Sequence, residues 1–279
     1  MATRFVTAGV TDLTTIGLVT GEPLVFRDGS QTITGVDMTA GPAVASIVNW
    51  VIPTTFSGLI GSGSGIGLPV TGYIRNQGGG IFNYYPTAST CARFVQLGPS
   101  TTNLFSGAIT RLEVKNGAVN IYASCTVPTL VMSGGVVNAT YIGTTSDYQN
   151  LDMSGGTLIS ERGMDSNFSG ATMTIAGGYA KFARINSSTN LPVATTGSAN
   201  GVFTVTGTAQ VNWQGGDIDT LRGGGTTASI DFGSIQQNIT INNLIATKDF
   251  IDRSNFAPAG FTITITSKTI SAGENDNVP

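Results

Sequence analysis

The stretch that decides the fold is Leu130-Val131-Met132-Ser133-Gly134-Gly135, which recurs as Leu151-Asp152-Met153-Ser154-Gly155-Gly156. Both copies place apolar side chains at alternate positions and follow them with two glycines. Alternation with a period of two is typical of a β-strand with one buried face, and glycine readily adopts the positive φ of a corner. The phrase therefore predicts a short strand that ends in a turn.

Looser copies of this phrase run through the middle of the chain. Recurrence at steps of 18, 21, 22, 30, 18 and 18 residues is typical of a repeat protein. The leading residues of the copies are Leu112, Leu130, Leu151, Met173, Phe203, Leu221 and Ile239. A second alternating run follows several corners, at Val119 and Ile121, Val137 and Ala139, and Ala180 and Phe182. One repeat is therefore predicted to contain two or three short strands.

Short strands at this spacing form either an antiparallel sandwich or a solenoid in which each repeat is one coil stacked on the last. The solenoid is favoured because equivalent positions keep the same character from copy to copy, as stacking requires. We predict an all-β chain that forms a right-handed parallel β-helix over residues 22–247, with irregular coils at 47–108 and regular repeats at 109–247.

The two ends of the chain depart from the repeat. Residues 1–21 are rich in Thr with scattered apolar residues, and they predict an extended N-terminal arm. Residues 248–279 begin with a cluster of charges, which is typical of the end of a solenoid because its edge strand must be shielded. Within them residues 261–266 alternate as a strand, which is predicted either to cap the solenoid at its C-terminal end or to pair with another subunit, and a short tail follows.

The composition agrees with a solenoid that has a polar, weakly charged surface. Gly accounts for 38 of 279 residues and charged residues for 10%, against about 7% and about 25% in ordinary proteins. An apolar fraction of 40% is too high for a disordered chain. The net charge of -3, with Lys and Arg scattered along the chain, predicts no basic stripe and no nucleic-acid partner.

Segments for export or membrane insertion are not recognisable in the sequence. It lacks the charged start, apolar run and small-residue cleavage site of a signal peptide, and no stretch is apolar for long enough to span a bilayer. Synthesis in the cytoplasm, without a membrane partner, is therefore expected. In this reducing compartment Cys91 and Cys125 are predicted to be buried free thiols, and two Cys without any His cannot complete a tetrahedral metal site.

A glycine-rich loop at residues 61–67 is a candidate for a nucleotide site. It lacks the G-x-G-x-x-G order and the Lys of a phosphate-binding loop, and no helix pattern follows it. We therefore predict no cofactor and no bound metal for this chain.

Four stretches can be compared with known proteins: the opening Met-Ala-Thr-Arg-Phe-Val, Leu24-Val25-Phe26 with the Asp28-Gly29 turn, Gln31-Thr32-Ile33, and the run from Thr129 to Val137. Together they resemble β-helical auxiliary proteins of tailed-bacteriophage heads, and the resemblance covers most of residues 1–250. It implies a structural virion protein on the capsid surface, made in the host cytoplasm, that decorates or cements the head by binding the major capsid protein.

Icosahedral lattices have three-fold sites, so a homo-oligomer, and a trimer in particular, is expected of such a protein. The predicted arm is then expected to supply capsid or subunit contacts through its apolar residues. These are Phe5, Val10, Leu13 and Ile16.

A rival hypothesis is a phage tailspike or fibre protein that binds or depolymerises host surface glycans, since tailspikes also use β-helices. Depolymerisation needs two carboxylates about 5–9.5 Å apart. The outward positions of the phrases form a column of Glu113, Val131, Asp152, Thr174, Thr204, Arg222 and Thr240. At about 4.8 Å per coil, Glu113 and Asp152 are expected to lie about 9.6 Å apart, with Val131 between them.

Catalysis is not favoured at this pair. Neither carboxylate has an evident neighbour that would raise its pKa for acid work, and the chain has no His and no G-x-S-x-G motif. Asp217 and Asp219 share one strand face and form a second candidate, either for Ca2+ or as part of a solvated loop. We therefore predict a protein that is not an enzyme.

Overall fold

The structure is a computed structural model of the chain, and it describes residues 2–7, 13–27, 31–33, 44–49, 54–56, 59–60, 63–64, 70–84, 90–139, 149–160, 168–183, 199–225, 227–246 and 257–270. These residues are β-strands almost throughout. Within them the one helical segment is η1 (Leu13–Ile16), a four-residue 3-10 turn. No helix in these ranges has the length and apolar character that crossing a membrane requires.

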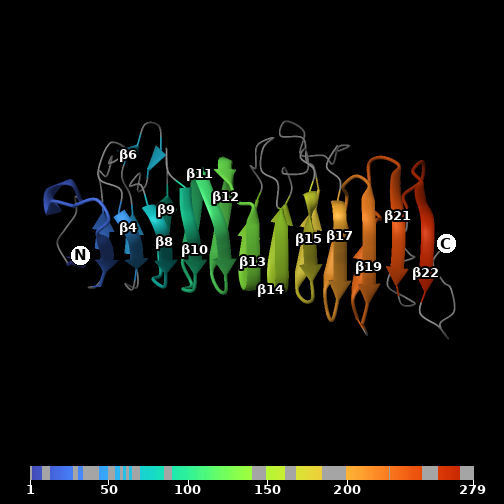
Figure 1. Ribbon diagram of the computed structural model, residues 1–279, viewed down its shortest axis with the longest axis horizontal. Coiled ribbons are helices and arrows are strands. Elements are labelled where there is room, and N and C mark those ends of the chain that lie inside the picture. Colours follow the sequence, from blue (N-terminus) through green and yellow to red (C-terminus); the bar gives the residue numbers. More distant parts are fainter. Residues whose placement is uncertain are drawn as a thin grey trace. The chain divides into compact units, whose positions relative to one another are not determined.

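The chain folds into two compact units. Unit 1 comprises Met1–Val127 and Gly135–Asn138, and unit 2 comprises Pro128–Gly134 and Ala139–Pro279, so β13 (Thr129–Asn138) contributes to both. In each unit the described strands stack in parallel as the coils of a β-solenoid, which confirms the predicted parallel β-helix (Figure 1). The antiparallel sandwich is excluded.

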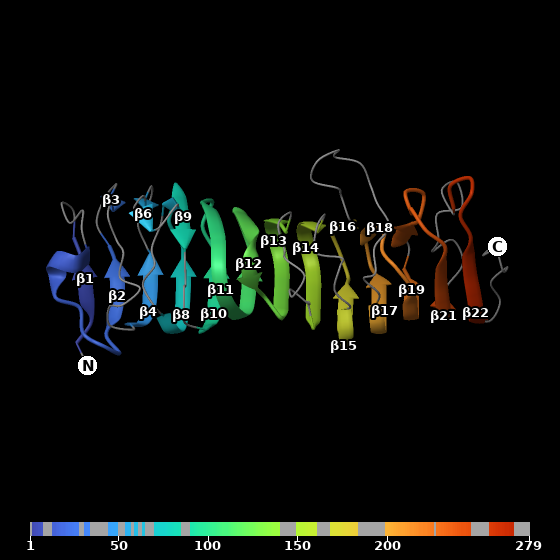
Figure 2. The same cartoon turned by 90° about the horizontal axis from the view of Figure 1, so that it is seen from above.

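Two columns of parallel strands build unit 1 (Figure 2). The first column contains, in order, β1 (Arg4–Val6), β2 (Pro23–Phe26), β4 (Val44–Asn49), β8 (Val70–Asn76), β10 (Thr90–Gln96) and the second half of β11 (Thr101–Val114). The second column contains β9 (Ile81–Tyr84), the first half of β11, β12 (Ala118–Thr126) and residues 136–138 of β13. Two smaller pairs are β3 (Gln31–Ile33) parallel to β5 (Thr54–Phe56) and β6 (Leu59–Ile60) antiparallel to β7 (Gly63–Ser64).

Unit 2 is built in the same way. Its first column contains β14 (Asn150–Ser160), β15 (Phe168–Ile175), β17 (Ala199–Thr206), β19 (Ile218–Gly224), β21 (Ile239–Ala246) and β22 (Ile263–Ile270). Its second column contains the end of β14, β16 (Tyr179–Phe182), β18 (Gln210–Trp213) and β20 (Ser229–Asp231). All of these pairs are parallel.

The predicted phrase residues form the core. The leading residues are each no more than 3% exposed, which confirms that they point inward: Leu112, Leu130, Leu151, Met173, Phe203, Leu221 and Ile239. Aromatic rings fill the wider parts of the interior, as in the contact between Phe203 and Trp213, whose ring centres lie 5.4 Å apart. Burial of these side chains is the main stabilising contribution within each unit.

The last predicted copy of the phrase is wrong in register. Leu221 pairs with Leu244 and not with Ile239. The reason lies at Asn242 and Asn243, which are both exposed and break the alternation inside β21. β21 therefore contains two runs of alternating buried residues that are out of phase with each other, Ile239 with Ile241 and Leu244 with Ala246. The predicted copy of the phrase corresponds to the first run, whereas Leu221 pairs within the second.

The glycines of the phrase are required by the stacking of one corner on the next. Gly178 has φ +82°, and a Cβ at this position would collide with the backbone oxygen of Gly156 in the preceding coil. Gly135 has φ +71°, and its Cβ would lie 2.8 Å from the backbone oxygen of Gly117. Both conditions, positive φ and close backbone approach, exclude a side chain.

A ladder of asparagine side chains runs through the second column of unit 1. Each Nδ2 donates to Oδ1 of the asparagine one coil earlier, at 2.7 Å from Asn103 to Asn83, 2.8 Å from Asn120 to Asn103 and 3.0 Å from Asn138 to Asn120. The four residues occupy equivalent positions in the strand register. Because an amide side chain both donates and accepts, identical residues satisfy one another in this geometry. The ladder therefore holds four coils in one register.

A buried polar cluster occupies part of the unit 1 interior. The Nδ2 atom of Asn76 lies within hydrogen-bond distance of Gln96 Oε1, Ser100 Oγ and Thr102 Oγ1, at 3.0, 2.8 and 3.1 Å. All four side chains are buried. Since buried polar groups cost free energy unless they are paired, this cluster favours the one arrangement of coils that brings its members together.

The N-terminal segment differs from the predicted extended arm in its described part. β1 pairs in parallel with β2, and Arg4 Nε forms an ion pair with Glu22 Oε1 at 3.1 Å. Val6 and Leu13 are completely buried. The scattered apolar residues here reflect burial in the first coil, so the described part of this segment belongs to the solenoid.

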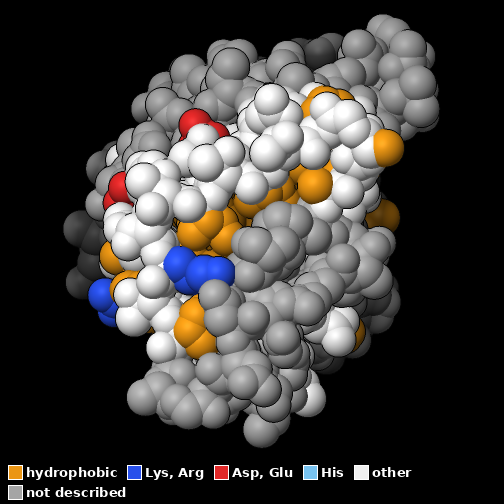
Figure 3. Space-filling model, turned by 90° about the vertical axis from the view of Figure 1, so that its right-hand side faces the viewer, with side chains coloured by type: hydrophobic (Ala, Val, Ile, Leu, Met, Phe, Trp, Pro, Cys, Tyr) orange, Lys and Arg blue, Asp and Glu red, His pale blue; other side chains and the backbone are white. Residues whose placement is uncertain are grey.

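At the other end the predicted cap strand is present as β22. It begins at Ile263 and ends at Ile270, later than the predicted 261–266, because its pairing with β21 extends to Ala246. Most of its side chains are exposed. Figure 3 views the molecule from the β22 side, and the described side chains seen there are mostly uncharged, with apolar ones among them.

Candidate functional site

The four residues predicted to contact a capsid or a second subunit are not equivalent in the structure. Phe5 is 48% exposed on β1, whereas Leu13 is completely buried and cannot reach a partner, which corrects its assignment as a contact residue. Ile16 is half-buried at the end of η1. Val10 lies outside the described residues. Phe5 is therefore the member of this set that the structure supports as a candidate contact.

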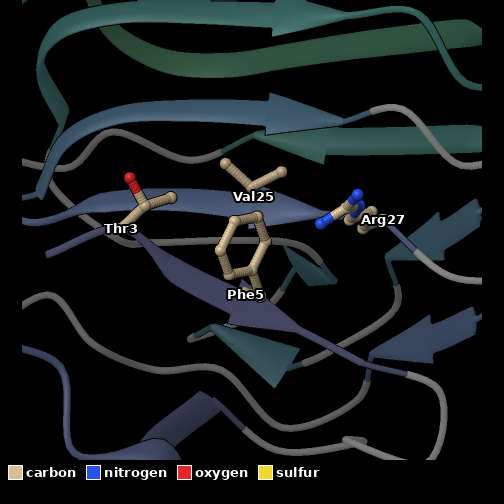
Figure 4. Close-up of a pocket in the computed structure, with 4 residues that line it drawn as sticks. All are labelled: Thr3, Phe5, Val25 and Arg27. Carbon is tan, nitrogen blue, oxygen red and sulfur yellow. The ribbon is translucent and has the colours of Figure 1, made fainter.

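Phe5 borders an open pocket in the first coil of unit 1, which we call the first-coil pocket (Figure 4). The pocket has a volume of about 500 Å3 and is lined by Thr3, Phe5, Val25 and Arg27. The Arg27 guanidinium carbon lies 5.3 Å from the centre of the Phe5 ring, which is a cation–π contact. This contact holds the exposed ring at the mouth of the pocket.

The strand register continues from the first-coil pocket into a longer column along unit 1, whose members range from the exposed Phe5 to the nearly buried Val48, Val95 and Glu113. One residue per coil is aligned, in the order Phe5, Val25, Val48, Arg75, Val95 and Glu113. At about 4.8 Å per coil, the column is about 24 Å long. A neighbouring column on the same face aligns Tyr73, Arg93 and Arg111. We call the two columns together the outer face of unit 1.

Four cations, which we call the basic cluster, gather on or beside this face: Arg75, Arg93, Arg111 and Lys115. Between residues 38 and 146 they are the only Lys and Arg, and Glu113 is the only acidic residue, so four positive charges and one negative charge leave +3. This finding corrects the prediction that the cations are scattered and form no basic stripe. The sequence did contain a signal, because Arg93 and Arg111 are 18 residues apart, which is one coil.

Glu113 is held between two arginines. Arg93 donates two hydrogen bonds to it, from Nε to Oε1 and from Nη2 to Oε2, both at 2.8 Å, and Arg111 Nε donates to Oε1 at 2.6 Å. The carboxylate is nearly buried, while both arginine side chains are about half-exposed. The two hydrogen bonds from Arg93, followed by the single one from Arg111, hold the pKa of Glu113 below its usual value, against the opposing effect of burial.

A second open pocket, which we call the basic pocket, lies on the same face. It has a volume of about 300 Å3 and is lined by Tyr73, Arg75, Arg93, Val95, Leu97 and Lys115. Tyr73 is 45% exposed. Lys115 is exposed, and its backbone N–H is fixed by a 2.9 Å hydrogen bond to the Gln96 carbonyl. The lining therefore combines three cations, one aromatic ring and two aliphatic side chains.

The pKa of Glu113 is shifted in the opposite direction to that of a catalytic acid. A general acid in glycan cleavage needs a raised pKa, whereas the two arginines lower the pKa of Glu113. Its proposed partner Asp152 belongs to unit 2, where it is exposed and pairs in register with Thr174. The hydrogen bonds therefore give Glu113 a structural role, in which it fixes the positions of the Arg93 and Arg111 side chains.

The second candidate pair of carboxylates has structural partners. Asp217 Oδ1 accepts the backbone N–H of Thr240 at 2.6 Å, and Asp219 Oδ1 accepts from Asn242 Nδ2 at 3.3 Å. Both residues thus connect one coil of unit 2 to the next. Among the residues that the structure describes, no three Cys, Asp or Glu side chains are grouped so that they could hold a metal ion.

Cys91 and Cys125 are buried free thiols, as predicted. Burial raises the pKa of Cys91 to about 11 and that of Cys125 to about 12, so both thiols are protonated at neutral pH. A protonated thiol is a weak nucleophile and a weak metal ligand, which leaves both residues a packing role.

The ion pairs of Glu113 predict a pH-dependent stability of unit 1. Glu113→Gln should lower the free energy of unfolding by about 1–2 kcal/mol at pH 7, because charge-assisted hydrogen bonds are lost at a partly exposed site. A carboxylate with a lowered pKa in the folded state stabilises the fold above its unfolded pKa of about 4.3 and loses this effect as the pH falls through the folded pKa. Urea unfolding of both proteins at pH 7 and at about pH 3 measures the difference.

The wild type and Glu113→Gln should therefore converge in acid. Arg111→Gln keeps the two-bond contact with Arg93 and should cost less than Glu113→Gln at pH 7. A gap between Glu113→Gln and wild type that is the same at both pH values would show that the ion pairs do not stabilise unit 1.

The fold and the described surface define the class of the protein: a parallel β-solenoid with an exposed aromatic pocket and a basic cluster, both in unit 1. No protein-family model, curated protein or solved structure matches this chain.

Proposed function

We propose that the chain is a structural virion protein that decorates or cements the head of a tailed bacteriophage, and that it binds the major capsid protein through the first-coil pocket. The sequence resemblance to β-helical head auxiliary proteins supports this role, and the β-solenoid fold is compatible with it. The observation that carries the proposal is Phe5, a large apolar ring that is exposed on the first strand beside a pocket of about 500 Å3.

An exposed aromatic ring beside an open pocket is suited to anchoring a partner. Burying one such side chain contributes about 1.5–3 kcal/mol, and aromatic anchors are enriched among the residues that dominate protein interfaces. Arg27 holds the ring in place and adds a cation at the rim. In a trimer three copies of this contact act together, so a weak single contact gives firm attachment.

The state of Glu113 favours a structural role over the tailspike alternative with glycan cleavage. A glycosidase of either stereochemistry needs one carboxylic acid that stays protonated near neutral pH. Glu113 is bound by two arginines and its pKa is lowered, so it is ionised there. This argues against catalysis at the carboxylate that the sequence offered as a candidate.

Phe5→Glu tests attachment. The substitution places a charge in the first-coil pocket and should weaken binding to heads that lack the protein by at least about tenfold, which corresponds to about 1.4 kcal/mol. Co-sedimentation of purified protein with heads of the phage that encodes it measures the affinity. A point substitution is preferable to deleting the segment, because Val6 and Leu13 are buried and their removal would open the core.

Val19→Glu is the matched control, since Val19 is 58% exposed and does not line the pocket. It should bind heads as the wild type does, and both variants should keep the melting temperature of the free protein. Equal binding by Phe5→Glu and wild type would refute attachment through this pocket. Failure of the wild-type protein to bind heads at all would refute the capsid role.

A further inference from the structure

The basic pocket is separate from the proposed capsid contact, and its lining has the composition of a ligand site. We propose that it binds a polysaccharide that carries carboxylates, of the uronic-acid type, without cleaving it. This binding function does not depend on attachment to a capsid. It rests on the carboxylate recognition already present in the cluster, the mixed lining of the pocket and the repetition of cations along the coils.

The outer face of unit 1 already shows carboxylate recognition. Arg93 binds Glu113 through two parallel hydrogen bonds, which is the geometry in which a guanidinium group matches a planar carboxylate. Glu113 also holds Arg111 on the adjacent coil. Both arginine side chains stay about half-exposed, and Lys115 is exposed beside them. Three exposed cations, Arg93, Arg111 and Lys115, therefore surround one carboxylate, and this excess of positive charge favours an external anion.

The remaining lining distinguishes a sugar from a phosphate backbone. A pyranose ring has a face of C–H groups, which packs against aromatic and aliphatic side chains, and a rim of polar groups. Tyr73, which is exposed, and Leu97, which is half-buried, supply such an apolar surface next to the cations, while the pocket-lining Val95 is nearly buried. A phosphodiester backbone has no comparable apolar face, and single-stranded nucleic acid is bound by several aromatic side chains on which successive bases stack. Among the described residues, Tyr73 is the one aromatic residue that lines this pocket.

The arrangement of the cations fits a polymer with a repeated charge. Arg93 and Arg111 occupy the same position on consecutive coils, which places their backbones about 4.8 Å apart. Arg75 lies one coil before Val95, on the column that ends at Glu113. The positive charges are therefore distributed along the axis on which the coils of unit 1 stack. A polysaccharide with one carboxylate on each sugar can lie along this axis, so that several of its carboxylates face cations of the basic cluster at the same time.

Binding of polygalacturonate to the full chain tests the proposal, and fully methyl-esterified polygalacturonate is the matched neutral polymer. We expect retention of the protein by immobilised polygalacturonate at low salt, with affinity falling as salt is added, and no retention by the ester. Lys115→Gln should weaken binding about fivefold or more and reduce the slope of log affinity against log salt by about 0.7. Tyr73→Ser should weaken binding to a similar extent without changing that slope.

Arg222→Gln, at an exposed arginine of unit 2, is the control and should bind as the wild type does. Melting curves of all variants exclude unfolding as the cause of a loss, since the two pocket side chains are exposed. Equal binding of polygalacturonate and its ester, or wild-type binding by Lys115→Gln and Tyr73→Ser, would overturn the proposal. Tighter binding of oligothymidylate or polyglutamate than of polygalacturonate would also overturn it, in favour of a nucleic-acid or an acidic-protein partner.

Discussion

Met132→Asp should destabilise unit 2 by at least about 4 kcal/mol, which is most of the roughly 5 kcal/mol that holds a marginally stable domain folded. Met132 is 1% exposed and points inward from β13. An aspartate there must either remain charged without a partner or become protonated, and both states cost free energy. The fluorescence of the buried Trp213, followed through a urea titration, measures the loss.

The neighbouring substitution Val131→Asp provides the matched control. Val131 points outward from the same strand and is partly exposed, so an aspartate there can reach water. We expect a cost below about 1 kcal/mol. Equal destabilisation by the two variants would contradict the register in which Met132 points into the core.

Gly178→Ala should be nearly as damaging, although it adds a single methyl group. The added Cβ would collide with the backbone oxygen of Gly156 and lie 2.9 Å from the Met153 side chain. Backbone atoms of a stacked coil cannot move aside without breaking the ladder of hydrogen bonds. A positive φ of +82° adds about 1–2 kcal/mol of strain for alanine. Altogether we expect a loss of about 3 kcal/mol or more in the free energy of unfolding.

Gly260→Ala separates the two causes of that loss. Gly260 has φ +94°, but a Cβ there would meet no atom of the described residues within 4 Å. Its substitution should therefore show the backbone strain alone, about 1–2 kcal/mol. Similar losses for Gly178→Ala and Gly260→Ala would show that the close approach of successive coils does not limit the choice of residue.

The core of the solenoid could be predicted because one local pattern recurs. Each phrase contains its own strand period and its own turn residue, so Leu151 and Met153 could be assigned to the interior without knowledge of their partners. The prediction was wrong where the local pattern has two solutions. In β21 the exposed pair Asn242 and Asn243 shifts the alternation, and only the pairing of Leu244 with Leu221 decides between them.

The first coil could not be predicted for a different reason. Val6 and Leu13 are isolated apolar residues with no periodic context, so the sequence does not distinguish burial in the chain's own coil from contact with a partner. The ion pair between Arg4 and Glu22 joins residues 18 positions apart, and such a contact follows only from the parallel pairing of β1 with β2.

The basic cluster was missed because its residues come together across coils. Along the chain Arg75, Arg93 and Arg111 are separated by long uncharged stretches and resemble scattered charges. Placed one coil above another, they share a face with Glu113 between two of them. Aligning the sequence at the coil period, and then looking for columns of one charge sign, would have indicated the cluster. The exposure of Tyr73 beside it depends on the fold and has no sequence signal.

The asparagine ladder of unit 1 has a polarity. The Nδ2 groups of Asn103, Asn120 and Asn138 all donate toward the N-terminal coil, so the amide dipoles of the ladder add, with the positive pole toward Asn83 and the negative pole at Asn138. Deamidation of Asn120 to aspartate would keep the acceptor for Asn138 but remove the donor to Asn103. An oxygen of the new carboxylate would then face the Oδ1 atom of Asn103 in the preceding coil. Deamidation of one asparagine in the ladder therefore removes the side-chain hydrogen bond to the preceding coil and keeps the one to the following coil.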